Sequence, residues 1–324
     1  MITGVSQSKG IVRGQRSMSN INRRQWIAAS LSAAVPSVFG LHAEGREDIT
    51  NDSANSNVSR RKEMMSNTEK KANLKGNIHQ AVSRWCYSDI PFPQFCDICR
   101  EMGIVGIDLV MPEDWKMVVD HGLAVSMGSL PEVNITEGIN RTENHDKVVA
   151  CYEKYIPIAA DLGITNVISL SGNRGGIDDE AGIAACTEAM KRVMPTAEKY
   201  GVTVHMELLN EYDHTDYHCS HTSWGAEVCR RVGSPNFKLL YDIYHMQRSE
   251  GEIIGTIRKY ADYIGHYHTG GNPGRNDIDN TQEIYYPAIM RAILETGFSG
   301  FVAHEFVPRD GINSLRRAVE ICDV

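Results

Sequence analysis

Acidic and histidine side chains stand at the ends of four consecutive apolar runs in the second half of the sequence. In chain order they are Glu207, Asp242, His245, His266, His268, His304 and Glu305. Aspartate and glutamate are depleted in strand-like apolar runs, so their repeated placement there argues against accident. Oxygen and imidazole ligands suit Mn²⁺, Mg²⁺, Co²⁺ and Zn²⁺, whereas the lack of cysteine at these run ends disfavours a structural zinc site. The pattern predicts a site for a divalent metal ion.

Short apolar runs, each ending in polar or glycine residues, alternate with longer helical patterns from residue 75 onward. The eight runs are "NIHQAVSRW", "GIVGIDLV", "LAVSMGSL", "ITNVISLSG", "VTVHMELLN", "FKLLYDIYHM", "YIGHYHTGG" and "GFVAHEFVP". Stretches between them, such as "DKVVACYEKYIPIAADLG", have apolar residues at helical spacings and a closing glycine. This alternation is typical of an α/β fold of the (β/α)8 or TIM barrel type. A doubly wound sheet is the alternative, but no GxGxxG follows the first run.

The barrel prediction places the metal-binding side chains at one rim, because active sites of such barrels lie at the C-terminal ends of the strands. Four neighbouring strands would deliver these ligands: Glu207, Asp242, His268 and Glu305. Since side chains alternate along a strand, His266 shares the face of His268 but lies one layer deeper. By the same alternation His304 faces away from Glu305, and we expect it to be a packing residue.

The segment "HTGGNPGR", residues 268–275, follows the seventh run and is rich in glycine. Glycine and proline allow a tight turn, so we expect this loop to bring Arg275 back to the rim. A single arginine serves a carboxylate well, and loops after the seventh and eighth strands of barrels often bind phosphate. Both ligand types therefore remain open for Arg275.

The N-terminal part of the chain has the features of an address rather than of a domain. The stretch "NINRRQWIAASLSAAVPSVFGLHA" combines Arg23 and Arg24 with a short apolar segment that a proline interrupts. We predict a twin-arginine export signal over residues 1–43, without a stable membrane span, and an exported or periplasmic location, with a cytoplasmic one as the alternative. Residues 44–71 are polar and predict a disordered linker. Residues 72–324 then form the catalytic barrel.

Composition limits the partners that this chain is expected to have. Of 324 residues, 42% are hydrophobic and 23% charged, with a formal net charge of -8. This acidic balance disfavours nucleic acid and favours a small-molecule substrate. The single CxxC, Cys96 and Cys99, lies on one face of a predicted helix, so we expect core packing rather than a zinc or redox role. The oligomeric state stays open, with a homo-oligomer among the alternatives.

Several segments carry a resemblance to a known family. They are "HMELLN", "LLYDIYHMQ", "GHYHTGGNPGRND", "VAHEFVP" and, between the first two, "DHTDYHCSHTSWGAEVCRRVGSPN". Together they resemble the hydroxypyruvate isomerase family within the larger xylose isomerase-like barrels, alongside the tagatose and psicose 3-epimerases. The resemblance covers the expected barrel but neither the export signal nor the linker. It implies a xylose isomerase-like TIM barrel that uses a divalent metal ion on a small hydroxy-carbonyl or sugar substrate.

The resemblance also implies roles for individual residues. Glu207 and Glu305 match two glutamates that bind the metal and act as the catalytic acid/base pair, while Asp242 and His268 match the other metal ligands. The residues expected to bind substrate are His245, Arg275 and His266. Hydroxypyruvate isomerases usually carry glutamine at the position of His268, whereas the ketose epimerases carry histidine. This departure leaves the substrate class open.

The chemistry implied is proton transfer beside a carbonyl group. One glutamate removes the proton and the other returns it, while a metal ion stabilises the enediolate. Exchange on opposite faces of one carbon gives epimerisation, and transfer between neighbouring carbons gives aldose–ketose isomerisation; the sequence does not choose between them. Two alternatives are a secreted sugar-binding barrel without catalysis and a metal-dependent phosphodiesterase of the same fold. Two glutamates favour catalysis over binding alone, and the acidic balance disfavours the phosphodiesterase.

Overall fold

The structure, a computed structural model, describes residues 74–324, and these contain a ring of parallel strands. The strands are β1 (His79–Ser83), β2 (Gly106–Asp108), β3 (Ala124–Val125), β4 (Asn166–Ser169), β5 (Thr203–Glu207), β6 (Phe237–Asp242), β7 (Ile264–Thr269) and β8 (Phe301–His304). They pair in the order β3-β2-β1-β8-β7-β6-β5-β4. The ring closes after β3, where Gly128 donates to the backbone oxygen of Asn166 and accepts from the N–H of Ile168, both at 2.9 Å. The predicted (β/α)8 barrel is confirmed.

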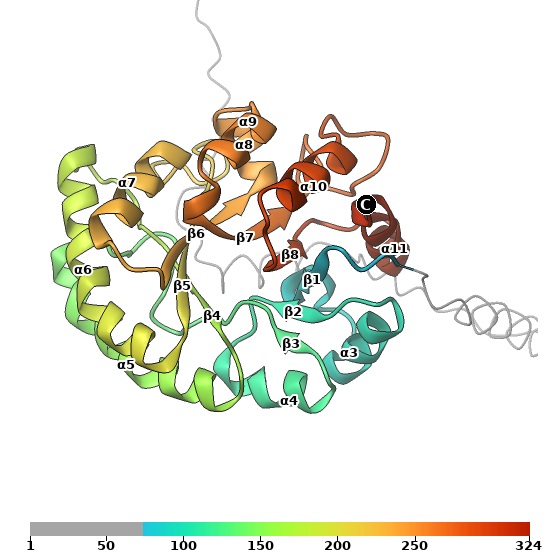
Figure 1. Cartoon of the computed structure of the whole chain (residues 1–324), viewed down its shortest axis with the longest axis horizontal. Helices are drawn as coiled ribbons and strands as arrows, with labels where there is room; N and C mark the ends of the chain where they lie inside the picture. Colours follow the sequence, from blue (N-terminus) through green and yellow to red (C-terminus); the bar gives the residue numbers. More distant parts are fainter. Residues whose placement is uncertain (1–73) are drawn as a thin grey trace, which may run out of the picture.

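Helices cover the outside of the ring (Figure 1). They are α3 (Phe92–Glu101), α4 (Trp115–Asp120), α5 (His145–Asp161), α6 (Asp179–Tyr200), α7 (Thr222–Val232), α8 (Ile243–Ser249), α9 (Ile253–Lys259), α10 (Tyr286–Glu295) and α11 (Gly311–Cys322). The longest helix, α6, shows which residues determine where a helix begins and ends. The side chain of Asp178 accepts from the N–H of Ala181 at the first turn, and the helix ends at Gly201, whose φ of 66° costs glycine little.

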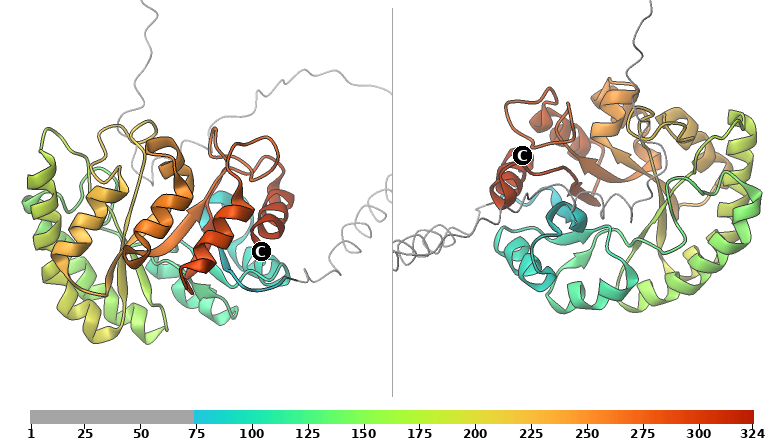
Figure 2. Two further views of the ribbon diagram at one scale, coloured as in Figure 1. Left: turned by 45° about the horizontal axis from the view of Figure 1, so that its top comes forward. Right: turned by 180° about the vertical axis from the view of Figure 1, so that it is seen from behind.

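The strands separate an apolar layer from a polar interior, and the views in Figure 2 show the helices surrounding them. Alternate residues of β5 and β7 divide between the two environments. The buried apolar ones are Val204, Met206 and Tyr267, and the buried polar ones are His205, Glu207, His266 and His268. Because every second side chain of a strand shares a face, the polar residues line up toward one end of the barrel.

Two further sequence predictions are confirmed. Cys96 and Cys99 are buried in α3 and unpaired, as core packing requires. His304 is buried beside β1, where its Nε2 lies 2.9 Å from Oε1 of Gln80 and its Nδ1 lies 2.9 Å from Oγ1 of Thr269. It therefore has a structural role on the face away from Glu305.

The predicted export signal (residues 1–43), the predicted linker (residues 44–71) and the predicted domain boundary at residue 72 lie outside the described residues. Over residues 74–324, none of the helices has the length and apolar character needed to cross a bilayer. The chain ends next to the start of the barrel, since both carboxylate oxygens of Asp323 accept from the backbone N–H of Lys75 at 2.8 and 3.0 Å.

Candidate metal centre

Three carboxylates and one imidazole converge at the C-terminal ends of β5 to β8. Nδ1 of His268 lies 2.5 Å from Oε2 of Glu305 and 3.2 Å from Oε1 of Glu207. Oδ2 of Asp242 lies 3.8 Å from the same nitrogen. One ligand atom from each residue lies within 4.8 Å of the others, and all four residues are buried. The structure thus brings together the four residues that the sequence predicts as metal ligands.

The parallel strands set this arrangement. Asp242 is the register partner of His268 across β6 and β7. Glu305 directly follows β8, and its N–H donates to the backbone oxygen of Thr269 at 2.9 Å. Asp242 also caps α8, because its Oδ1 accepts from the N–H of His245 at 3.0 Å. That hydrogen bond occupies Oδ1 and leaves Oδ2 directed at the cluster.

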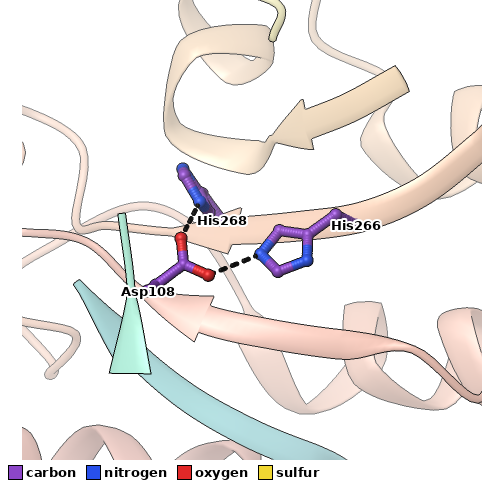
Figure 3. A group of neighbouring side chains, drawn as sticks. All are labelled: Asp108, His266 and His268. Atoms are coloured by element: carbon purple, nitrogen blue, oxygen red, sulfur yellow. Dashed lines mark hydrogen bonds and ion pairs between the residues drawn. The ribbon is translucent and has the colours of Figure 1, made fainter. Parts of the chain in front are cut away.

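A fourth carboxylate orients His268 from behind. Asp108, the last residue of β2, places Oδ2 2.8 Å from Nε2 of His268 and Oδ1 3.1 Å from Nε2 of His266 (Figure 3). The hydroxyl of Ser126 donates to Oδ1 of Asp108 at 2.6 Å. With Nε2 of His268 engaged by Asp108, Nδ1 is the nitrogen that faces the three other carboxylates. A carboxylate that fixes a histidine in this way is a common feature of metal sites.

Electrostatics shows how negative this region is. Burial alone would lower the pKa of His268, but the charge of Glu305 and the hydrogen bonds with nearby carboxylates raise it well above its ordinary value. Burial alone would raise the pKa of Asp108, whereas His266 and His268 hold it well below its ordinary value. The cluster therefore favours positive charge at its centre.

The donor set fits a divalent cation. Buried carboxylates a few ångströms apart repel one another unless positive charge lies among them. Nδ1 of His268 is buried and faces oxygens of Glu305, Glu207 and Asp242 at 2.5, 3.2 and 3.8 Å. Three carboxylates with one imidazole suit Mn²⁺, Mg²⁺, Co²⁺ or Zn²⁺. The residues that would hold the ion are Glu207, Asp242, His268 and Glu305.

Arg275 reaches the cluster from the glycine-rich loop after β7. Its Nη2 donates to Oδ2 of Asp242 at 2.6 Å and to Oε2 of Glu305 at 2.7 Å. The loop turns tightly, since Gly271 and Asn276 exchange backbone hydrogen bonds of 2.8 and 3.1 Å and a Cβ at Gly271 would lie 2.2 Å from a later backbone oxygen. Burial would lower the pKa of Arg275, but Glu305 and Asp242 raise it, so the guanidinium stays charged.

Trp85 holds the other oxygen of Glu305. It lies in the 3-10 helix η1 (Arg84–Tyr87), directly after β1, and its indole N–H donates to Oε1 of Glu305 at 2.6 Å. Oε2 of the same carboxylate faces His268 and Arg275. Because each oxygen has a different neighbour, the orientation of the Glu305 carboxylate is fixed.

His245 lies beside Asp242, in the first turn of α8. Its Nδ1 accepts from the backbone N–H and the side-chain amide of Asn210, at 3.2 and 2.5 Å. The proton of the neutral ring is therefore on Nε2, which lies 3.8 Å from Oδ2 of Asp242 and has no hydrogen-bond partner among the described residues. Burial lowers the pKa of His245 well below its ordinary value. This side chain is a neutral hydrogen-bond donor beside the cluster.

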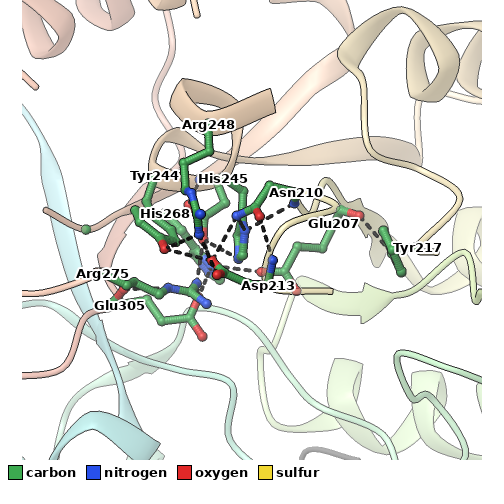
Figure 4. A network of polar contacts seen from close by, with 12 residues as sticks. Glu207, Asn210, Asp213, Tyr217, Tyr244, His245, Arg248, His268, Arg275 and Glu305 are labelled. Carbon is green, nitrogen blue, oxygen red and sulfur yellow. Dashed lines mark hydrogen bonds and ion pairs between the residues drawn. The ribbon is translucent and has the colours of Figure 1, made fainter. Parts of the chain in front are cut away.

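The loop after β5 is tied to α8 above His245 (Figure 4). The carboxylate of Asp213 accepts from the hydroxyl of Tyr244 at 2.7 Å, from the amide of Asn210 at 3.1 Å and from the guanidinium of Arg248. The guanidinium of Arg248 also stacks 4.9 Å from the ring of Tyr212. These contacts hold Asn210 in place, and Asn210 in turn fixes the ring of His245.

Not every residue at this centre was predicted. Asp108 ends the run "GIVGIDLV" as the other carboxylates end theirs, so the same signal identifies it. Trp85 and Asp213 carry no such signal, since their roles depend on partners far away in the sequence. His266, expected to bind substrate, lies fully buried behind His268 and against Asp108, and its contact with substrate stays a prediction.

Comparisons with known proteins agree with this geometry. Residues 96–322 match the family described as the xylose isomerase-like TIM barrel. Hydroxypyruvate isomerase of Escherichia coli (strain K12) is 27% identical over 223 residues, which are 64% of this chain and 85% of that protein. D-psicose 3-epimerase of Ruminiclostridium cellulolyticum is 30% identical over 139 residues, 42% of this chain and 45% of the epimerase.

Solved structures share the fold. An AP endonuclease of family 2 from Brucella melitensis has a TM-score of 0.67 and 21% identity, covering 73% of this chain and 96% of its own. The IOLI protein with a binding zinc atom has a TM-score of 0.58 and 14% identity, covering 76% and 95%. At these identities the likeness concerns the barrel itself.

Proposed function

The chain belongs to the xylose isomerase-like TIM barrel family, and we propose that it is a metal-dependent isomerase or epimerase of a small hydroxy-carbonyl or sugar substrate, similar to hydroxypyruvate isomerase. The curated relatives matched above are an isomerase and an epimerase, which supports this class of reaction. One observation carries the proposal. Glu207 and Glu305, from different strands, both approach the same nitrogen of His268 inside one buried cluster.

Two carboxylates in one site suit a reaction that removes a proton and returns it. Such a proton lies on the carbon next to a carbonyl and is too weakly acidic for an isolated carboxylate to remove quickly. A divalent cation held by Glu207, Asp242, His268 and Glu305 would supply positive charge next to the negative charge that develops as the proton leaves. Either Glu207 or Glu305 then acts as the base, and the other as the acid.

The remaining residues prepare these two glutamates. Trp85 and Arg275 fix the two oxygens of Glu305 separately, so that its proton transfer has a defined direction. Asp108 keeps Nδ1 of His268 directed at the cluster. His245 offers an N–H to a hydroxyl or carbonyl oxygen of the substrate, and burial of the ligands excludes water from the reacting atoms.

Two other functions fit less well. A barrel that only binds sugar needs no second proton carrier, whereas this cluster contains two glutamates. A phosphodiesterase of the same fold would need more histidine ligands and a basic rim, but the four-residue cluster in the described part of the chain has one histidine and three carboxylates. Proton exchange beside a carbonyl therefore explains the donor set best.

Solvent deuterium exchange, followed by NMR, tests the proposal. The full chain is loaded with Mg²⁺ and incubated in D₂O with free ketoses, keto-sugars and hydroxypyruvate, and turnover is followed by NMR. Mn²⁺ replaces Mg²⁺ in measurements of substrate binding. We expect deuterium to enter beside the carbonyl of at least one substrate, and to be lost in Glu207→Gln and in Glu305→Gln. Exchange that persists in both variants, or that occurs with none of the substrates, contradicts the proposal.

We also propose that the chain is exported, on the basis of the paired arginines in residues 1–43. Cell fractionation with N-terminal sequencing is the test. Recovery of the intact chain in the cytoplasm contradicts export and leaves the proposed reaction untouched.

A further inference from the structure

Acidic side chains outnumber basic ones around the mouth of the barrel, at the C-terminal ends of the strands. The segments that follow the eight strands, counted up to α3, α4, α5, α6, α7, α9, α10 and α11 and so including the short helix α8, are 84–91, 109–114, 126–144, 170–178, 208–221, 243–252, 270–285 and 305–310. Together they contain six arginines, no lysine and 17 aspartates or glutamates. An excess of carboxylates at an entrance gives a negative potential, which slows the approach of anions.

Each of these six arginines already has an acceptor within the protein. Arg84 donates to the backbone oxygen of Ile90, Arg141 to that of Arg174, Arg174 to Asp179, Arg248 to Asp213, Arg275 to Asp242 and Glu305, and Arg309 to Asp279. A guanidinium that is engaged by a carboxylate must break that contact before it can bind an anionic substrate. In the described structure four of these arginines are thus engaged by carboxylates, whereas Arg84 and Arg141 donate to backbone oxygens.

Arg275 is the cation closest to the reacting groups, and its contacts are to the metal ligands themselves. Its Nη2 lies between Oδ2 of Asp242 and Oε2 of Glu305, at 2.6 and 2.7 Å, and its side chain is only 16% exposed. Three ligand carboxylates carry a charge of about −3, and Arg275 with a divalent cation restores about +3. The positive charges thus balance the ligand carboxylates without substrate, and Asp108 behind His268 adds a further negative charge. An anionic group entering it would leave buried negative charge uncompensated.

One donor beside the cluster that lacks a hydrogen-bond partner among the described residues is neutral. Nε2 of His245 carries a proton, is buried and has no hydrogen-bond partner within residues 74–324. Such an N–H serves a hydroxyl or carbonyl oxygen without adding charge. The polar contacts that remain available beside the metal ligands therefore suit a hydroxylated, uncharged molecule.

We propose that the substrate of this site is an uncharged hydroxy-carbonyl compound, such as a free ketose or keto-sugar, and that Arg275 excludes 2-oxo acids and sugar phosphates by keeping the ligand carboxylates neutralised. This inference rests on the proposed function. It assigns Arg275 to the metal ligands rather than to an anionic group of the substrate, so the similarity to hydroxypyruvate isomerase concerns the barrel and the type of reaction and not the acid group of the substrate.

Matched pairs of compounds separate the charge of the substrate from its shape. Dihydroxyacetone and hydroxypyruvate differ in a hydroxymethyl group against a carboxylate, and erythrulose differs from its four-carbon 2-oxo acid in the same way. Binding to the Mn²⁺-loaded full chain is measured by paramagnetic broadening of the compounds' proton signals, which needs no turnover. We expect the neutral member of each pair to bind at least about tenfold more tightly, with little dependence on salt.

Preferential broadening of the 2-oxo acids, weakening with added salt, overturns the inference and leaves the proposed function intact. Failure of all four compounds to bind or to exchange deuterium counts against the proposed function and, with it, this inference. The two failures are therefore distinguishable in one experiment.

The variant Arg275→Gln tests the assignment of the arginine. If it neutralises the ligands, its removal leaves more negative charge for the metal, and Mn²⁺ affinity by calorimetry should rise several-fold, roughly 3-fold or more. Arg309→Gln, on the neighbouring loop and paired with Asp279, is the matched control and should leave Mn²⁺ affinity unchanged. Equal Mn²⁺ affinity in wild type and Arg275→Gln, with loss of 2-oxo acid binding, would overturn the assignment.

Discussion

Oδ2 of Asp108 lies 2.8 Å from Nε2 of His268, although the two residues belong to strands that are not neighbours in the barrel. β1 and β8 separate β2 from β7 in the ring, so this contact crosses the interior. It determines which nitrogen of His268 faces the three ligand carboxylates. The geometry of the candidate metal centre therefore depends on a residue that is not itself among its four ligands.

Replacing Asp108 by asparagine should weaken metal binding. Without the carboxylate, His268 loses the charged acceptor that orients it and makes Nδ1 a better ligand, and losses of this kind are about 10- to 100-fold in affinity. Calorimetric titration of the metal-free chain with Mn²⁺ measures the change. Asp120→Asn, an exposed carboxylate on α4 paired with Lys116, is the control. Equal Mn²⁺ affinity in both variants would show that Asp108 does not position His268.

Replacing Trp85 by phenylalanine should slow proton exchange and leave the metal in place. The substitution keeps an aromatic ring beside Glu305 but removes the N–H that donates to Oε1. A hydrogen bond to a charged group contributes about 1.5 kcal/mol or more, which corresponds to roughly tenfold in rate. The rate of deuterium incorporation and the Mn²⁺ affinity are measured together. Trp224→Phe, on α7, is the control, and a parallel fall in metal affinity in Trp85→Phe would point to a role in ligand binding instead.

The periodic features of this chain were predictable because they depend on neighbours in sequence. Eight apolar runs and their closing carboxylates predicted the strands, their common rim and the ligands from Glu207 to Glu305. Once parallel strands are ordered around a barrel, their ends meet at one face, so Asp242 and His268 lie side by side.

Contacts between distant segments were not predictable in the same way. The indole of Trp85 meets Glu305 across 220 positions of sequence, and nothing in the run containing Trp85 indicates that partner. The contacts of Arg275 with two ligand carboxylates likewise depend on how tightly the loop turns at Gly271. Sequence periodicity places a residue on an element, whereas packing decides what its side chain touches.

Replacing Asp213 by asparagine should loosen the loop over His245 at neutral pH. Burial would raise the pKa of Asp213, but donors from Arg248, Tyr244 and Asn210 hold it well below its ordinary value. A pKa that is lower in the folded state than in the unfolded state stabilises the folded state at every pH above the unfolded pKa, which is about 4. This stabilisation is lost as the pH falls from there through the folded pKa. Hydrogen exchange of residues 208–221 should therefore be faster in Asp213→Asn at pH 7, with a smaller difference below pH ~4. A difference that does not depend on pH would contradict the ionic origin.

Metal removal should destabilise the barrel, because the metal-free cluster holds repelling carboxylates in a buried position. A ligand that binds only the folded state stabilises it by about 2.7 kcal/mol at 100 times its Kd. For a domain of roughly 150–250 residues, each kcal/mol raises Tm by about 2–4 °C, so Mn²⁺ should raise Tm by roughly 5–10 °C after treatment with a chelator.

The variant Asp242→Asn shows whether that rise comes from this cluster. Loss of one ligand carboxylate should reduce the rise in Tm with Mn²⁺. Because Asp242 also accepts hydrogen bonds from Arg275 and from the N–H of His245, the rise is measured for each variant against its own metal-free Tm. Asp279→Asn, an aspartate of the mouth outside the cluster, should keep the full rise. If Asp242→Asn keeps the full rise as well, the stabilising ion is bound elsewhere, and the four-residue cluster is not the metal centre.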